Sequence, residues 1–340
     1  MRQSPGAVRV CSVGQSLLLC VALSVGLRSA SFRAAPHNSN PLEVQALKGP
    51  SHGVNPVLQL RVARSPVTAG GDESPDVPKT FVDMTSAELA DAVPELKRLK
   101  PAESQEMLPQ ILERAGAAVA SFFDNFPDTA CTEHVTSTVR RASLAGTLHY
   151  DNFYNYMALA EAGSMTGHLR EYRTDAKGEL AQPDGIVTFG FVALSVNFHS
   201  DFRADSRFRY LGREEMEKQD TYVVAFAQRP QVARQTASVQ YLGQSGTVYL
   251  QGLAWIDPVS FRIVRLRTDI EQPEPNVGMQ NETIEVLYSE VSFAQGHETL
   301  WLPREVTVTG QLQQYIFHNQ HHYSDYHLFQ VQVEQKQQKP

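Results

Sequence analysis

The sequence predicts an α+β fold whose main element is one antiparallel β-sheet. The C-terminal half contains runs of strand-forming residues joined by short turns, and consecutive strands of this kind pair antiparallel. Apolar side chains at helical spacing precede these runs, and a basic, then apolar, amino terminus precedes both. We therefore predict a signal peptide, a disordered or extended linker, a helical segment that packs on the sheet, and a β domain, at residues 1–30, 31–80, 81–128 and 129–336.

The amino terminus has the pattern of a secretory signal. Arg2 and Arg9 give it positive charge without an acid, and an apolar core follows from Ser16 to Leu27. This core is shorter than the roughly 20 residues that a spanning helix needs. We predict cleavage near Ala30, export to the periplasm or secretion, and no membrane span after cleavage; an uncleaved anchor is the alternative.

Charge and cysteine usage restrict the partners and the source of stability. The whole chain has a formal net charge of −7, and the predicted signal holds three arginines and no acid, which leaves −10 for the exported chain. This balance excludes nucleic acid as a partner, because a phosphate backbone requires a basic face. Cys131 is the only cysteine outside the signal. No intramolecular disulfide can then form, and a packed core must hold the domain together.

Two helices are predicted between the linker and the strands. Within the linker only residues 57–62 (VLQLRV) have the pattern of a strand. Thr85 precedes a helical pattern as a capping residue, and Pro94 divides that helix. The second helix runs from Ser104, as its cap, to Asp124, with an apolar stripe along one side.

The rest of the chain predicts strands and one short buried helix. Residues 186–202 favour the helix, and residues 257–260 (DPVS) are typical of a turn. The predicted strands are Thr132–Leu144, Phe153–Leu159, Gly167–Thr174, Tyr222–Gln228, Val248–Ile256, Phe261–Ile270, Thr283–Phe293, Leu300–Gly310 and Leu312–Val333.

No motif for catalysis or cofactor binding is found in the sequence. Ser245 lies between two glycines, but the surrounding runs are strand-like, whereas a nucleophile elbow requires a turn from strand to helix. His297 and Glu298 begin a zinc-protease pattern, whose second histidine is replaced by Trp301. No pair of carboxylates has a spacing that indicates an acid and a base. We expect a protein that is not an enzyme and has no cofactor.

Four histidines near the C-terminus do not have the spacing of a metal site. They are His318, His321, His322 and His327. His318 and His322 share one face of a strand, but lie about 13 Å apart at about 3.3 Å per residue. A zinc ion needs ligand atoms about 2 Å away. We therefore expect no metal, and interpret the histidines as part of a solvated strand face.

Large apolar side chains recur along the predicted sheet. They form either an ordinary core beneath the covering helix or the lining of an apolar pocket between the sheet and its helices. For the pocket we predict ligand-binding roles for Tyr222, Val224, Phe226, Tyr249, Trp255 and Trp301.

Three stretches of the C-terminal half resemble the outer-membrane lipoprotein-sorting superfamily, the LolA/LolB and MucB/RseB-like carriers. They are YLGREEMEKQDTYVVAFAQRP (210–230), GLAWIDPVSFRIVRLRTDI (252–270), and VLYSEVSF with LWLPREVTVTG (286–310). The similarity is closest to uncharacterised bacterial envelope members. It implies a curved, unclosed half-barrel with helices on its concave face, in addition to the N-terminal helices. It also implies a lipid or lipoprotein acyl chain as ligand; the alternative is an envelope protein-interaction or sensory module that binds no lipid.

Overall fold

The computed structural model describes residues 9–13, 16–20, 57–62, 79–143, 146–160, 169–181, 185–293 and 299–328. Its helices are α2 (Ser86–Ala92) and α3 (Leu108–Asp124), with 3-10 helices η1 (Pro94–Arg98), η2 (Leu194–Phe198) and η3 (Arg203–Asp205). Its strands are β1 (Arg9–Val13), β2 (Ser16–Cys20), β3 (Val57–Val62), β4 (Lys100–Pro101), β5 (Thr129–Arg141), β6 (Thr147–Ala160), β7 (Leu169–Thr174), β8 (Val187–Thr188), β9 (Ser206–Met216), β10 (Gln219–Gln228), β11 (Gln235–Tyr241), β12 (Gln244–Val248), β13 (Leu250–Ile256), β14 (Ile263–Ile270), β15 (Met279–Ser292), β16 (Thr299–Leu312) and β17 (Tyr315–Leu328).

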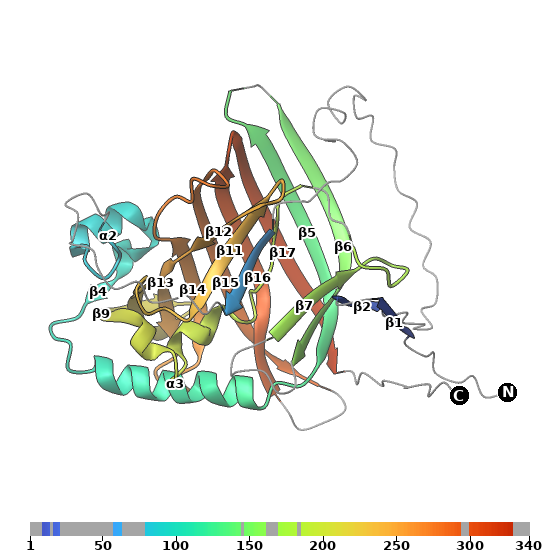
Figure 1. The fold of residues 1–340 in the computed structure, drawn as a ribbon. Coiled ribbons are helices and arrows are strands. Elements are labelled where there is room, and N and C mark those ends of the chain that lie inside the picture. Colours follow the sequence, from blue (N-terminus) through green and yellow to red (C-terminus); the bar gives the residue numbers. More distant parts are fainter. Residues whose placement is uncertain are drawn as a thin grey trace.

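Eleven of these strands form one large sheet that curves around the core (Figure 1). Their order is β4-β9-β10-β13-β14-β15-β16-β17-β5-β6-β7, and every neighbouring pair is antiparallel. The ends of this order, β4 and β7, do not pair with each other, so the sheet remains open. The predicted α+β fold with an antiparallel half-barrel is confirmed.

A second sheet has four strands in the order β12-β11-β3-β8. Its apolar side chains belong to the same hydrophobic core as those on the concave face of the large sheet. Strand β3 is the run that the sequence allows as a strand in the predicted linker. It pairs antiparallel with β11 and parallel with β8, which lie more than a hundred residues further along the chain. Residues 63–78 lie outside the described residues.

Alternation along the strands gives the large sheet two different faces. Tyr222, Val224 and Phe226 of β10 face the concave side and join the main core. Val223 and Ala225 face the convex side, where they pack under α2 and η1. The sheet therefore supports helices on both faces.

The helix α2 is capped as the sequence predicts. The Thr85 hydroxyl accepts a hydrogen bond from the backbone N–H of Glu88, and the Glu88 carboxylate accepts one from the N–H of Thr85. Pro94 begins η1 directly after this helix, so the predicted division is confirmed. Leu89 and Leu96 are buried against the convex face.

The helix α3 starts later than predicted and has no side-chain cap. Ser104 accepts a bond from the N–H of Glu106 in the preceding turn, and Met107 occupies the cap position, so the predicted cap at Ser104 is wrong. The apolar stripe of α3 is buried in the main core. Gly116 lets the helix approach η2 closely, because a Cβ there would lie 3.1 Å from the Phe198 carbonyl oxygen. The predicted buried helix is η2, all of whose residues are buried.

The predicted signal and C-terminal strands are only partly described. Strands β1 and β2 pair antiparallel within the predicted signal, and the described structure contains no helix long and apolar enough to cross a membrane. The domain boundaries and the signal remain predictions. The histidine–glutamate pair at residues 297–298 lies outside the described residues.

Candidate functional site

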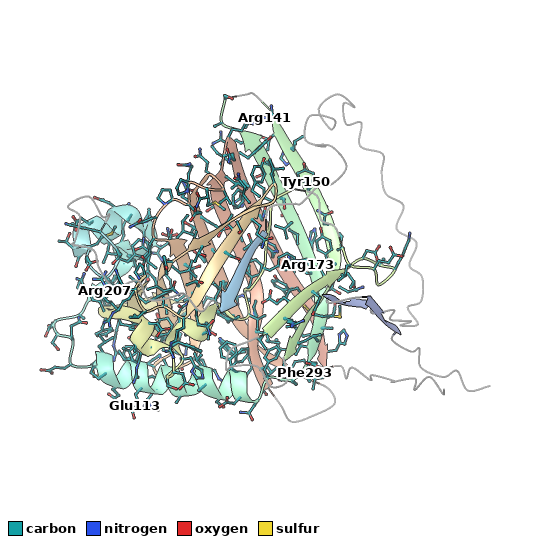
Figure 2. All side chains as sticks on the ribbon, viewed as in Figure 1. Glu113, Arg141, Tyr150, Arg173, Arg207 and Phe293 are labelled. Atoms are coloured by element: carbon teal, nitrogen blue, oxygen red, sulfur yellow. The ribbon has the colours of Figure 1, made fainter. Side chains whose placement is uncertain are left out.

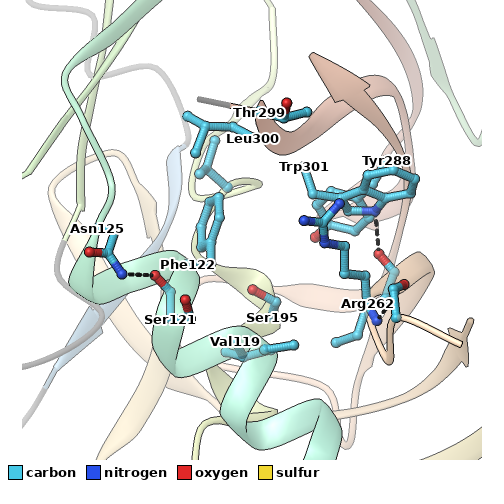
Figure 3. Close-up of a pocket in the computed structure, with 14 residues that line it drawn as sticks. Val119, Ser121, Phe122, Asn125, Ser195, Arg262, Tyr288, Thr299, Leu300 and Trp301 are labelled. Carbon is cyan, nitrogen blue, oxygen red and sulfur yellow. Dashed lines mark hydrogen bonds between the residues drawn. The ribbon is translucent and has the colours of Figure 1, made fainter. Parts of the chain in front are cut away.

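A pocket of about 540 Å³ lies between α3 and the ends of β14, β15 and β16 (Figure 3). We call it the α3 pocket. It is lined by Ala118, Val119, Ser121, Phe122, Asn125, Val192, Ser195, Ser260, Arg262, Ile263, Tyr288, Thr299, Leu300 and Trp301. Its walls are predominantly apolar and aromatic, as is usual for sites that bind small molecules.

Helical and strand periodicity bring these side chains together. Val119 and Phe122 are three residues apart on α3, so both lie on one side of the helix. Tyr288 points inward from β15, and Trp301 lies near the start of β16. The turn after β13 delivers Arg262 to the same space (Figure 3).

Several polar groups of the pocket are already bonded within the protein. The Trp301 indole N–H donates to the Ile263 carbonyl at 2.8 Å. The Tyr288 hydroxyl donates to the Phe191 carbonyl at 3.4 Å, and burial raises the pKa of this tyrosine, so it stays neutral. The Asn125 amide donates to the Ser121 carbonyl at the end of α3. These contacts leave the aromatic faces as the main surface for a ligand.

Of the six predicted ligand-binding residues, Trp301 lines the α3 pocket. Tyr222, Val224 and Phe226 lie on the same face of the sheet but are fully packed in the main core. Trp255 points to the opposite face, beneath η1, where its indole N–H donates to Glu214 at 2.6 Å. The pocket residues from α3 and η2 were missed, because the sequence does not show which part of the stripe stays uncovered.

Tyr249 lies away from the α3 pocket as well. It separates β12 from β13, and its side chain is half-buried. Its backbone carbonyl accepts a bond from the N–H of Glu271 at 2.8 Å. Tyr249 is therefore the residue that connects β12 of the second sheet to β13 of the large sheet.

A network of buried charges lies elsewhere on the concave face. Arg173 of β7, which Figure 2 labels within the curve of the sheet, binds both carboxylate oxygens of Glu133 and donates to the Thr188 carbonyl. His321 and Tyr323 of β17 contact the same Glu133 carboxylate at 2.8 Å. Burial alone would raise the pKa of Glu133, but Arg173 and His321 outweigh it and hold that pKa well below its usual range.

This network corrects the interpretation of the histidines as one solvated strand face. His321 is 3% exposed and packs against the Phe191 ring, and burial lowers its pKa despite the Glu133 carboxylate. His318 and His322 lie on the convex face, where His318 is half-buried and His322 is exposed. No group of three or more potential metal-binding side chains occurs within the described residues.

Two further carboxyl groups are buried without a bonded cation among the described residues. Glu171 accepts hydrogen bonds from the N–H groups of Gly190 and Val192, and burial raises its pKa. Within the described part of the chain, Glu282 accepts a single hydrogen bond, from the Thr188 hydroxyl at 3.4 Å, and burial raises its pKa to about 8. Glu282 is 3% exposed and Glu171 is half-buried with both backbone bonds satisfied, so we interpret the two groups as structural.

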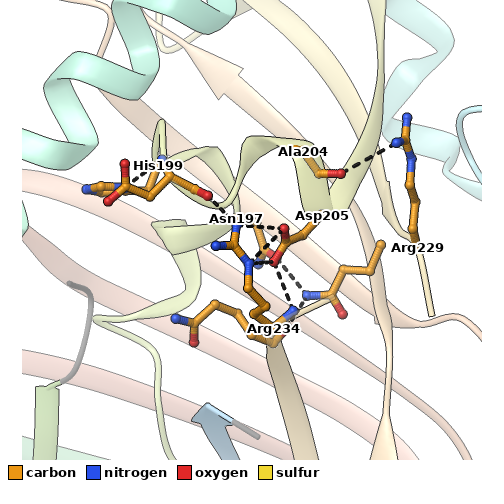
Figure 4. A network of polar contacts seen from close by, with 9 residues as sticks. Asn197, His199, Ala204, Asp205, Arg229 and Arg234 are labelled. Carbon is orange, nitrogen blue, oxygen red and sulfur yellow. Dashed lines mark hydrogen bonds and ion pairs between the residues drawn. The ribbon is translucent and has the colours of Figure 1, made fainter. Parts of the chain in front are cut away.

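A separate polar cluster joins the two sheets (Figure 4). Arg234, just before β11, binds the Asp205 carboxylate with two nitrogens. The Gln228 amide donates to Asn197 of η2 and to the Gln235 carbonyl. These bonds fix the position at which β11 begins, and they give the cluster an architectural role.

Comparison with known proteins finds similarity at the level of structure. No family model matches the chain, and no curated protein matches its sequence. A putative outer membrane lipoprotein-sorting protein domain from Vibrio parahaemolyticus is 12% identical, with 66% of this chain and 93% of that chain covered and a TM-score of 0.35. A LolA superfamily protein from Nitrosomonas europaea is 14% identical, with 66% and 94% covered and a TM-score of 0.29. A DUF1329 family protein from Desulfovibrio piger is 8% identical, with 65% and 92% covered and a TM-score of 0.30.

Proposed function

We propose that this protein is an exported, non-catalytic carrier that binds a lipid or lipoprotein acyl chain in the α3 pocket. The observation that carries the proposal is the pocket itself. Its volume of about 540 Å³ lies within the range of about 300–1,000 Å³ that ligand sites have, and its lining is mainly apolar. Each buried methylene contributes about 0.8 kcal/mol, so eight of them contribute about 6 kcal/mol against the cost of association.

Export is proposed from the amino-terminal sequence alone. Its basic start and short apolar core are typical of a secretory signal. Expression of the full chain with a C-terminal tag, followed by cell fractionation and N-terminal sequencing, tests this part. A mature form that begins near Ser31 supports export, and a full-length form in the cytoplasm contradicts it.

Binding of N-phenyl-1-naphthylamine, an uncharged apolar fluorophore, tests the carrier function. We expect saturable binding that an uncharged competitor such as dodecanol displaces. Ala118 lines the pocket from the half-buried side of α3, so a tryptophan at this position would occupy space that the fluorophore needs. We expect Ala118→Trp to raise the Kd of the fluorophore about tenfold or more, which corresponds to a loss of about 1.4 kcal/mol of binding free energy. The control is Ala117→Trp, on the exposed side of the same helix, which should bind like the unchanged protein.

Two results would overturn the carrier proposal. One is a folded protein that shows no saturable binding of the fluorophore. The other is equal weakening by Ala118→Trp and Ala117→Trp, because that places the fluorophore outside the pocket. A stable protein partner recovered with a chain that takes up no fluorophore would favour an envelope protein-interaction module.

A further inference from the structure

We infer that the α3 pocket selects amphiphiles with one anionic headgroup, a carboxylate or a phosphate, and that Arg262 binds this group. This inference rests on the proposed function, because it names the chemical class of the ligand for the same pocket. It adds a polar determinant to a site that would otherwise hold only an apolar chain.

The charge of the pocket is the first observation. Arg262 is the only charged side chain among the 14 described residues that line it. The chain as a whole is acidic, with a formal net charge of −7. A single cation in the lining, beside an apolar wall, favours an anionic headgroup at this place despite the negative net charge of the chain, since charge interactions strengthen where water is partly excluded.

The unused hydrogen-bonding capacity of Arg262 is the second observation. Its guanidinium group lies 5.7 Å from the centre of the Trp301 ring, and its one ion pair among the described residues is with the exposed Glu290 carboxylate, at 3.8 Å. This separation is too long for a hydrogen bond. Among the described residues the guanidinium makes no hydrogen bond, so its planar set of N–H donors remains available for a carboxylate or phosphate.

Other arginines of the protein differ in this respect. Arg173 binds both oxygens of Glu133, and Arg234 does the same with Asp205. Arg267 donates two bonds to Asp269. These three groups have carboxylate partners within hydrogen-bond distance, whereas Arg262 faces the pocket with only a distant one (Figure 3).

The backbone holds Arg262 in this place. The Asp257 carboxylate accepts bonds from the backbone N–H groups of Val259 and Ser260, which fixes the turn. Phe261 follows in a left-handed conformation, with φ of 58°, and its ring is buried. Arg262 follows this fixed turn directly, and its side chain lines the pocket.

One molecule can contact both parts of the site. Val119, Phe122 and Leu300 supply the apolar wall of the same pocket in which Arg262 lies. An acyl chain against this wall places its headgroup at the open side, where the Arg262 side chain is 41% exposed. The geometry therefore fits a single-chain amphiphile with its charge at one end.

Displacement of N-phenyl-1-naphthylamine by four dodecyl compounds tests the inference. Laurate, dodecyl phosphate, dodecanol and dodecyltrimethylammonium share one chain and differ in the headgroup. Below their micelle concentrations, we expect laurate or dodecyl phosphate to bind about tenfold or more tightly than dodecanol, as for a charge-assisted hydrogen bond. The cationic compound should bind no better than dodecanol. A preference between the two anions distinguishes a carboxylate from a phosphate site.

Arg262→Met should abolish the preference for anions, so that laurate, dodecyl phosphate and dodecanol displace the fluorophore with similar affinity. Arg262→Lys should keep part of the preference, and Arg229→Met, an exposed site outside the pocket, should keep all of it. Equal binding of laurate and dodecanol by the unchanged protein would overturn the inference while the carrier function stands. So would an unaltered preference in Arg262→Met. Absence of fluorophore binding would instead remove the proposed function itself.

Discussion

Replacing Glu282 by glutamine tests whether a buried carboxyl group limits the stability of this fold at alkaline pH. The Glu282 side chain points to the concave face, is 3% exposed, and accepts one long bond, from Thr188. No cation accompanies it among the described residues, and burial raises its pKa from 4.5 to about 8. The native protein therefore keeps this carboxyl group protonated at neutral pH.

The sign and size of the pH effect follow from this raised pKa. In the unfolded chain the same group ionises near 4.5. Between the two values the native state holds a proton that the unfolded state has lost, so the free energy of unfolding falls as the pH rises from about 4.5 to about 8. At about 1.36 kcal/mol per pH unit, the loss is on the order of 5 kcal/mol across that window. Glutamine cannot ionise and removes this loss.

Urea unfolding between about pH 5 and pH 9, followed by tryptophan fluorescence, measures the effect. Glu282→Gln and the unchanged protein should have similar stability near pH 5 and diverge by several kcal/mol near pH 9, with the variant more stable. Burial raises the pKa of Glu271 to about 7, so this group also titrates in the measured range. It is present in both proteins, so its contribution cancels when the two free energies of unfolding are subtracted. Glu290→Gln, at an exposed site on the same strand, should follow the unchanged protein. Parallel stability curves for Glu282→Gln and the unchanged protein would refute the reasoning.

Two further substitutions test the packing of the concave face. Arg173→Met should lower the free energy of unfolding by about 3–5 kcal/mol, because it leaves Glu133 buried without its cation. The double variant Glu133→Leu/Arg173→Met should regain most of this loss in the same urea assay, and a double variant as unstable as the single one would contradict the argument. Gly252→Ala should lower stability by about 1–3 kcal/mol, since its Cβ would meet the Arg267 carbonyl and the Phe226 ring. Gly246→Ala is the control, because a Cβ there meets the flexible side chain of Glu274. An equal decrease in the free energy of unfolding for both variants would show that the contacts of Gly252 do not cause the destabilisation.

Local chemistry made several elements of the fold predictable. The capping pair Thr85 and Glu88 and the break at Pro94 depend on residues within one turn of each other, so the sequence reveals them directly. The hairpin between β9 and β10 is different. Its two turn residues, Glu217 and Lys218, both have positive φ, although neither is of a type that favours this conformation. The strand pattern of residues 208–230 predicts this hairpin, but its two turn residues give no local signal, so the pairing of the strands imposes the turn.

The candidate sites depend on long-range pairing, which limited their prediction. Glu133 meets Arg173 and His321 across 40 and 188 residues of sequence, through the register of β5, β6, β7 and β17. Strand alternation indicates which side chains share a face, but not how deeply that face is covered. Phe226 was predicted in the pocket and is instead covered by Phe198 of η2. Trp301 stays half-buried and lines the α3 pocket together with Phe122 and Asn125 from the end of α3.

The buried charges and the α3 pocket are linked through one short segment, residues 190–195. The Glu171 carboxylate accepts the N–H groups of Gly190 and Val192, and the carbonyl between them, that of Phe191, accepts the hydroxyl of Tyr288. Val192 and Tyr288 also line the pocket. A carboxylate that binds two N–H groups of this segment fixes the backbone more firmly than apolar packing, because hydrogen bonds are directional. The polar groups buried on the concave face therefore define the shape of the apolar pocket that a ligand would enter.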